Sequence, residues 1–154
     1  LRTSLTAISS GRRFMVRFLD SSVFLHAYLK PKRKLTPAEE SLKNAAAEII
    51  NRVEEGEDVA TSVVHISEAM NIVETRLGLE AALRLLENLL STENIAVIPV
   101  DRGDFEQALA LATRYGMSPN DAVAALLSRD HGITEVYSFD KHLDTAPFVK
   151  RVSG

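Results

Sequence analysis

Short apolar runs alternate along this chain with longer segments in which apolar residues recur every three or four positions. The runs predict buried strands at 16–19, 58–61, 95–100, 135–139 and 148–152. The longer segments predict helices at 21–29, 36–55, 63–77, 79–91, 103–115 and 119–130. This alternation predicts an α/β fold, a three-layer α/β/α sandwich with a mostly parallel central sheet.

Start and stop signals support these helix boundaries. Thr36, Pro37 and Glu39 form the pattern of a capping box with proline in the first turn. Gly56 and Gly78 follow the last periodic residues of their helices, where glycine commonly ends a helix.

The length of 154 residues fits one domain, which we expect to span residues 15–154. Residues 1–14 contain three arginines and no acid, and Met15 follows them, so we interpret them as a leader or an artificial extension. A secretory signal is the less favoured alternative, because this stretch lacks a continuous apolar core. The chain has no cysteine and no apolar run of membrane-spanning length, which predicts a cytoplasmic protein outside the membrane.

The net charge is −3, and it becomes −6 when the three arginines of residues 1–14 are left out. A protein this acidic does not bind nucleic acid through bulk charge. A local basic patch or a bound cation would have to provide the attraction.

Carboxylates stand where predicted strands end. Asp20 ends the apolar run of "MVRFLDSSVFLHAYL", and Asp140 ends "VYSFD". Asp121 lies three residues after Ser118, in the first turn of a predicted helix that is apolar on all sides. Taken singly, each of the three acids is explained by helix capping.

Taken together, these acids indicate a metal site. Ligand sites of open parallel sheets lie outside the carboxyl ends of the strands. Two like charges about 5 Å apart cost roughly 3 kcal/mol at an effective dielectric constant near 20. A divalent cation removes this repulsion, and oxygen ligands favour Mg²⁺ or Mn²⁺ over zinc.

Glu68 is less clearly placed by its pattern. The helix at 63–77 has a main apolar stripe, formed by Val63, Ile66, Met70, Val73 and Leu77. Glu68 falls on the opposite, mixed face together with His65, so periodicity alone predicts a solvated glutamate. His65 and Glu68 are also an i, i+3 pair, which is usually a chance spacing.

In their order and spacing, Asp20, Glu68, Asp121 and Asp140 resemble the PIN-domain family, which includes the ribonuclease toxins of VapBC toxin–antitoxin pairs. Three stretches carry the resemblance, and they are "FLDSSVFL", "NDAVAALLSRDHG" and "VYSFDKHLD". Glu68 in "TSVVHISEAM" matches the family's acid on the middle helix.

The resemblance implies an Mg²⁺- or Mn²⁺-dependent endoribonuclease, in which a metal-activated water hydrolyses RNA phosphodiester bonds. Asp20, Asp121 and Asp140 would be metal ligands, and Glu68 would bind a second ion or orient the water. Ser22, Ser138 and Asn120 would hydrogen-bond around the ligands or the phosphate.

The resemblance also implies partners, namely a small antitoxin and a second copy of the chain. The leucines of 79–91 exceed what one core face needs, so this helix is either an intersubunit face or a buried helix. Two alternatives to a toxin remain, an RNA-processing PIN nuclease without an antitoxin and a non-catalytic RNA-binding or scaffold module.

One basic cluster, KPKRK at 30–34, offers Lys30, Lys32, Arg33 and Lys34. It is either a solvated linker or a loop that contacts RNA phosphates. The four histidines show no zinc spacing, although His142 lies near Asp140.

Overall fold

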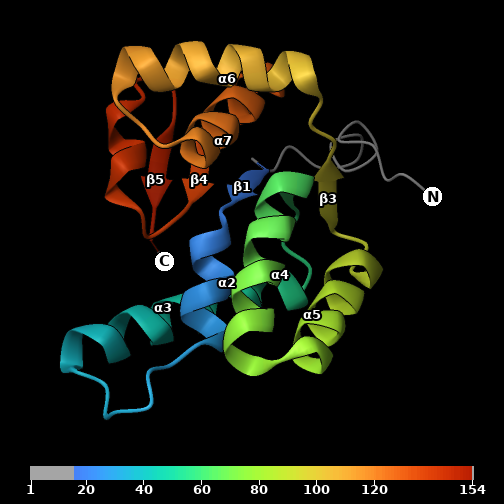
Figure 1. Cartoon of the computed structure of the whole chain (residues 1–154), viewed down its shortest axis with the longest axis vertical. Helices are drawn as coiled ribbons and strands as arrows, with labels where there is room; N and C mark the ends of the chain where they lie inside the picture. The colour runs from blue at the N-terminus through green and yellow to red at the C-terminus, as the bar shows by residue number, and fades with distance from the viewer. Residues whose placement is uncertain (1–15, 154) are drawn as a thin grey trace.

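A five-stranded parallel sheet lies at the centre of the computed structural model, which describes residues 16–153 (Figure 1). Its strands are β1 (Arg17–Leu19), β2 (Val59–Ser62), β3 (Ile95–Ile98), β4 (Glu135–Tyr137) and β5 (Lys150–Val152). Their order across the sheet is β3-β2-β1-β4-β5, and every described pair is parallel. The predicted strands are present, but the third, fourth and fifth are shorter than the apolar runs.

The helices lie close to their predicted positions. They are α2 (Ser21–Tyr28), α3 (Pro37–Glu54), α4 (Val63–Leu77), α5 (Leu79–Ser91), α6 (Arg102–Tyr115) and α7 (Pro119–Asp130). The capping box of Thr36 and Glu39 forms as expected at the start of α3. A short 3₁₀ helix, η1 (Lys141–Thr145), was not predicted.

Helices cover both faces of the sheet because strand residues alternate between two apolar clusters. Phe18, Ala60 and Val136 belong to the cluster that contains α6 and α7. Their neighbours Leu19, Val59 and Tyr137 belong to the cluster that contains α2, α3, α4 and α5. This alternation of side chains along each strand produces the predicted three-layer sandwich.

The central strand determines where a ligand can bind. β1 has β2 on one side and β4 on the other, with Phe18 paired to Ala60 and Leu19 paired to Tyr137. The chain leaves β1 toward one face through α2, whereas α7 packs on the other face and leads into β4. A crevice therefore opens at the carboxyl ends of β1 and β4, as expected at a topological switch point.

The stripe predicted for α4 is wrong at both ends. Val63 and Leu77 are 44% and 52% exposed, and the buried residues are His65, Ile66, Ala69 and Val73. His65, assigned by periodicity to the mixed face, has no exposed surface. His65 contacts Phe18 of β1 and Asn120 of α7, so this face of α4 packs against other elements, which periodicity does not reveal.

The leucines of α5 are divided between the core and the surface. Leu85 and Leu89 are buried, whereas Leu79, Leu83 and Leu90 are 59%, 56% and 64% exposed. The alternative of a fully buried helix is therefore wrong, and a row of leucines is left on the surface.

The predicted leader, residues 1–14, lies outside the described residues. Within 16–153, no helix combines the length and the apolar character that a membrane crossing requires.

Candidate metal centre

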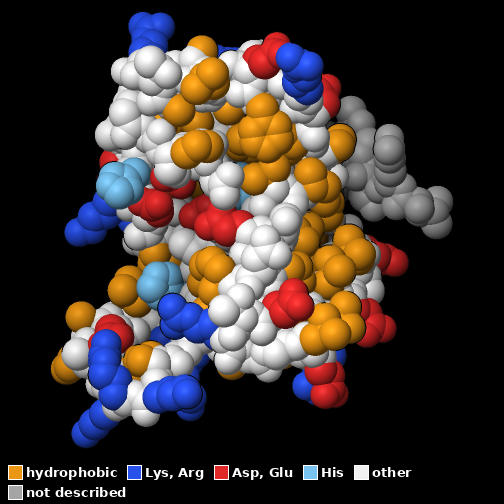
Figure 2. Space-filling model, in the orientation of Figure 1, with side chains coloured by type: hydrophobic (Ala, Val, Ile, Leu, Met, Phe, Trp, Pro, Cys, Tyr) orange, Lys and Arg blue, Asp and Glu red, His pale blue; other side chains and the backbone are white. Residues whose placement is uncertain are grey.

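A cleft of about 400 Å³ opens at the carboxyl ends of β1 and β4. Its walls contain all four predicted carboxylates, Asp20, Glu68, Asp121 and Asp140. No lysine or arginine is among the described residues that line it. Figure 2 shows acidic side chains gathered in the middle of this face, between the half that contains α6 and α7 and the half that contains α2 and α4.

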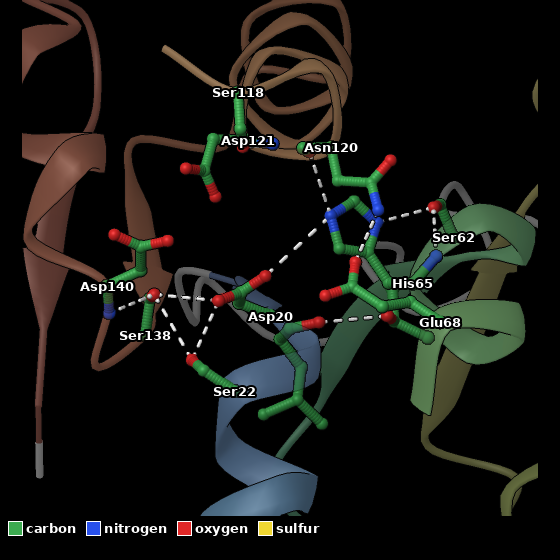
Figure 3. A network of polar contacts seen from close by, with 12 residues as sticks. Asp20, Ser22, Ser62, His65, Glu68, Ser118, Asn120, Asp121, Ser138 and Asp140 are labelled. Atoms are coloured by element: carbon green, nitrogen blue, oxygen red, sulfur yellow. Dashed lines mark hydrogen bonds and ion pairs between the residues drawn. The ribbon is translucent and has the colours of Figure 1, made fainter. Parts of the chain in front are cut away.

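Asp20 is held by two serines and does not use its side chain to cap α2. Its Oδ2 accepts hydrogen bonds from the hydroxyls of Ser22, at 2.7 Å, and Ser138, at 2.8 Å (Figure 3). The residue is the N-cap of α2 by position, but it makes no side-chain capping bond. Capping therefore does not explain this carboxylate, which is 4% exposed.

Asp140 reaches the same cleft from the end of β4. Its backbone N–H donates to Ser138 Oγ at 3.0 Å, which joins it to the bonds around Asp20. Its Oδ1 accepts from the backbone N–H of His142 at 2.9 Å, so it caps η1 as well. The ring Nδ1 of His142 lies 3.0 Å from the same oxygen.

Asp121 comes from the first turn of α7, on the opposite wall. Its backbone N–H donates to Ser118 Oγ at 3.3 Å, but its carboxylate does not return the bond, so there is no capping box. Asp121 Oδ2 is buried without a hydrogen-bond partner among the described residues. Burial, together with the charges of Asp140 and Asp20, raises the pKa of Asp121 to about 7.

Glu68 lies across the cleft, partly buried, and not free in solvent as periodicity predicted. The side-chain amide of Asn120 donates a short hydrogen bond to Glu68 Oε2. Asn120 stands directly before Asp121 and also lines the cleft.

These residues fit a divalent cation. Ligand atoms of Asp121, Asp140 and His142 lie within 4.8 Å of one another. Figure 3 shows the Asp121 side chain pointing into the space between Asp140 and Asp20. A divalent cation would stabilise a buried carboxylate oxygen that has no partner in a cleft lined by acids.

The basic cluster lies in the loop between α2 and α3, apart from the residues that line the cleft. Lys30, Lys32, Arg33 and Lys34 are all exposed. Arg33 pairs with Glu39, with two contacts of 2.9 and 3.1 Å. In Figure 2 basic side chains gather over this loop, on the same face as the acidic hollow.

The sequence analysis assigned no role in the site to two histidines that lie beside the carboxylates. His65 is buried beside Asp20, and its spacing of three from Glu68 was the available signal. His142 faces Asp140, and its closeness along the chain was the signal there. Burial lowers the pKa of His65.

An all-parallel α/β domain with carboxylates at its switch point is a class to which several families of metal-dependent enzymes belong. Comparison with known proteins narrows the class to one family. The PIN-domain family matches residues 17–149, and the chain belongs to this family.

Two curated relatives are ribonuclease VapC13 of Mycobacterium tuberculosis and the VapC ribonuclease Mb1869c of Mycobacterium bovis. Each is 36% identical over 58 residues, which is 37% of this chain. The matched segment spans 44% of the length of each relative, less than half.

Solved structures share the whole fold. The M. tuberculosis toxin VapC20, described as cleaving the sarcin–ricin loop, superposes with a TM-score of 0.68 at 25% identity, over 89% of this chain and 98% of that one. A toxin–antitoxin complex from Klebsiella pneumoniae gives 0.60 at 15% identity, over 87% and 95%. PAE2754 from Pyrobaculum aerophilum gives 0.58 at 22% identity, over 89% and 90%.

Proposed function

We propose that this protein is a metal-dependent endoribonuclease and the toxin of a VapBC-type pair. One observation carries the proposal. Asp121 Oδ2 is buried without a hydrogen-bond partner among residues 16–153, in a cleft whose described walls hold three further carboxylates and no lysine or arginine. Membership of the PIN-domain family implies use of a divalent metal ion. Oxygen ligands favour Mg²⁺ or Mn²⁺.

Asp20, Asp121 and Asp140 would hold the ion, because they line one cleft from three different parts of the fold. A bound divalent ion supplies Lewis-acid stabilisation of the charge that develops on an attacked phosphodiester. Ser22 and Ser138 hold Asp20 in place through its Oδ2, whereas Oδ1 lies 3.7 Å from His65 Nε2.

Glu68 would act from the opposite wall, by accepting a proton from the attacking water or by binding a second ion. Its bond from Asn120 fixes the carboxylate toward the cleft. Lys30, Lys32 and Lys34 would contact phosphates of the RNA outside the cleft and offset repulsion by the acidic walls.

An antitoxin would be the protein partner. The structural relatives support this, since they include the K. pneumoniae toxin–antitoxin complex and VapBC2 from Rickettsia felis bound to promoter DNA. We also propose a homodimer and a cytoplasmic location, as the resemblance and the composition predicted.

The first test is calorimetric titration of Mn²⁺ into the wild type and Asp140→Asn, followed by RNA cleavage assays with Asp20→Asn. We expect Mn²⁺ binding that is lost in Asp140→Asn, and metal-dependent cleavage that is lost in Asp20→Asn. Cleavage retained by Asp20→Asn would contradict the metal mechanism. Binding of RNA without cleavage at any metal concentration would favour the non-catalytic module.

The toxin assignment has a separate test, since a processing nuclease would have the same metal site. We expect a small reading frame beside the gene, growth arrest when this protein is expressed alone, and relief of the arrest when the product of that reading frame is expressed with it. Cleavage activity without growth arrest would favour an RNA-processing PIN nuclease.

A further inference from the structure

Two side chains of α4 make hydrogen bonds with Asn120, the residue that precedes Asp121 in the first turn of α7 (Figure 3). His65 Nε2 lies 3.1 Å from the backbone carbonyl oxygen of Asn120. Glu68 accepts a hydrogen bond from the Asn120 side-chain amide. His65 and Glu68 are three positions apart and share one face of α4, so they hold the backbone and the side chain of the same residue.

The partners of His65 define the direction of its hydrogen bonds. A carbonyl oxygen only accepts, so Nε2 must carry the proton that it donates to Asn120. Nδ1 lies 2.6 Å from Ser62 Oγ, which also accepts from the backbone N–H of His65 at 3.2 Å. With Nε2 protonated, the Ser62 hydroxyl donates to Nδ1 of a neutral ring. Both ring nitrogens of His65 and the hydroxyl of Ser62 then have hydrogen-bond partners.

Neighbouring side chains enclose the His65 ring completely. His65 has no exposed surface, and its ring meets the edge of Phe18 on β1 with centroids 5.0 Å apart. Nε2 also lies 3.7 Å from Asp20 Oδ1. One imidazole therefore touches three parts of the site: the end of β2, the first turn of α7 and the carboxylate at the end of β1.

Asp121 depends on this contact because one oxygen of its carboxylate is not anchored by a hydrogen bond. Its Oδ2 has no partner among residues 16–153, so the backbone of the first turn of α7 determines where the carboxylate lies. The Ser118 cap fixes this turn on one side, at the Asp121 backbone N–H. The bond from His65 to Asn120 fixes it toward Asp20 and Glu68.

We propose that His65 is a positioning residue, which donates from Nε2 to the Asn120 carbonyl and thereby sets the place of Asp121 in the metal site. His65 touches neither metal nor RNA in this role. The inference rests on the proposed function, since it takes Asp20, Asp121 and Asp140 as metal ligands. The competing explanation is that His65 only fills space in the core.

Mn²⁺ calorimetry on His65→Leu and His65→Gln separates positioning from packing. Leucine keeps an apolar side chain in the core without a donor, whereas the amide of glutamine can donate to Asn120 from near the place of Nε2. We expect His65→Leu to bind Mn²⁺ about tenfold more weakly, which corresponds to about 1.4 kcal/mol. We expect His65→Gln to stay within about threefold of the wild type, although both variants melt at lower temperature. Wild-type affinity in a folded His65→Leu, or equal losses in both variants, would overturn the proposal.

Nitrogen NMR of the histidine rings tests the same idea without a core substitution. We expect wild-type His65 to carry its proton on Nε2, and Ser62→Ala to weaken that preference and Mn²⁺ affinity together. Thr36→Ala is the matched control, because it also removes an N-cap hydroxyl but at α3, and should lower stability without changing Mn²⁺ affinity.

The outcomes also separate this inference from the proposed function. A wild type that binds no Mn²⁺ would overturn the proposed function and, with it, a role in metal affinity. A wild type that binds Mn²⁺ but has no proton on His65 Nε2 would overturn the role of His65 alone.

Discussion

Asp121 combines burial, an oxygen without a hydrogen-bond partner among the described residues and two neighbouring acids, which together shift its titration toward neutral pH. Its pKa of about 7 lies above the ordinary value of 3.8, so the folded state holds this proton more tightly than the unfolded chain. Without metal, the stability contributed by this group is fully present below pH 4 and is lost as the pH rises through about 7.

We expect Asp121→Asn to raise the melting temperature of the metal-free protein at pH 8, and to raise it less at pH 5. The variant carries no charge at position 121, so it avoids the cost of ionising this buried group that the wild type incurs above pH 7. Thermal melts at both pH values measure the difference. Asp130→Asn, an exposed acid at the other end of α7, should show no such pH-dependent difference.

Mn²⁺ affinity should rise with pH as Asp121 loses its proton, because an ion binds the deprotonated carboxylate. We expect Mn²⁺ affinity of the wild type to fall about tenfold between pH 8 and pH 6. Calorimetry at the two pH values is the measurement, and an affinity that does not change would show that Asp121 is not a ligand.

Ser128 is a second buried group with an unsatisfied atom, but it lies away from the cleft. Its hydroxyl in the interior of α7 has no hydrogen-bond partner among the described residues. We expect Ser128→Ala to leave the free energy of unfolding unchanged or to raise it by up to about 1 kcal/mol. Ser138→Ala should instead cost about 1–3 kcal/mol, since it removes a donor from buried Asp20. Urea unfolding of both variants tests the contrast, and equal losses would contradict it.

At the scale of elements, the link between α6 and α7 determines how the acid of α7 enters the cleft. Gly116 ends α6 with φ 67° and ψ 38°, a left-handed conformation, and Ser118 starts α7 two residues later. A β-carbon at Gly116 would meet nothing within 4 Å, so only the backbone conformation opposes a side chain there.

We therefore expect Gly116→Ala to lower the free energy of unfolding by about 1–2 kcal/mol, and Gly116→Asn to lower it less, because asparagine tolerates the left-handed region better. Urea unfolding of the two variants gives the comparison. Equal stability of Gly116→Ala and the wild type would show that the turn can adopt another conformation.

At the scale of the whole molecule, charge is divided between an acidic cleft and a basic loop. Lys30, Lys32 and Lys34 have no acidic partner among the described residues, unlike Arg33. We expect a triple change of these lysines to glutamine to weaken RNA binding and to reduce the slope of log affinity against log salt by up to about 2. The single change Arg33→Gln is the comparison and should alter the slope less. An unchanged slope in the triple variant would return this loop to the role of a solvated linker.

The exposed row of Leu79, Leu83 and Leu90 on α5 favours that helix as the face that joins two copies. We expect the wild type to have twice the mass of the 16.9 kDa chain in light scattering, and Leu83→Glu with Leu90→Glu to give the monomer mass. Leu109→Glu on α6 introduces the same charge at another exposed leucine. Dissociation by the α6 change and not by the α5 changes would move the interface to α6.

The sequence by itself determined the elements and the identity of the strand-end acids, because these are local. Apolar periodicity, the capping box of Thr36 and the glycines after the helices depend on neighbours within a few positions. The position of Asp20 directly after a buried strand was visible in the same way. Glu68 was found through its resemblance to a family, since periodicity placed it in solvent.

Only the tertiary structure decided which acids meet and how each is held. The order β3-β2-β1-β4-β5 brings Asp20 beside Ser138, 118 positions away, and no local pattern encodes that pairing. Burial of His65 and the unpartnered oxygen of Asp121 depend on α4, α7 and β1 packing around one cleft. These are properties of long-range contacts, and so the sequence could name the carboxylates but could not reveal the contacts of the imidazole that positions Asp121.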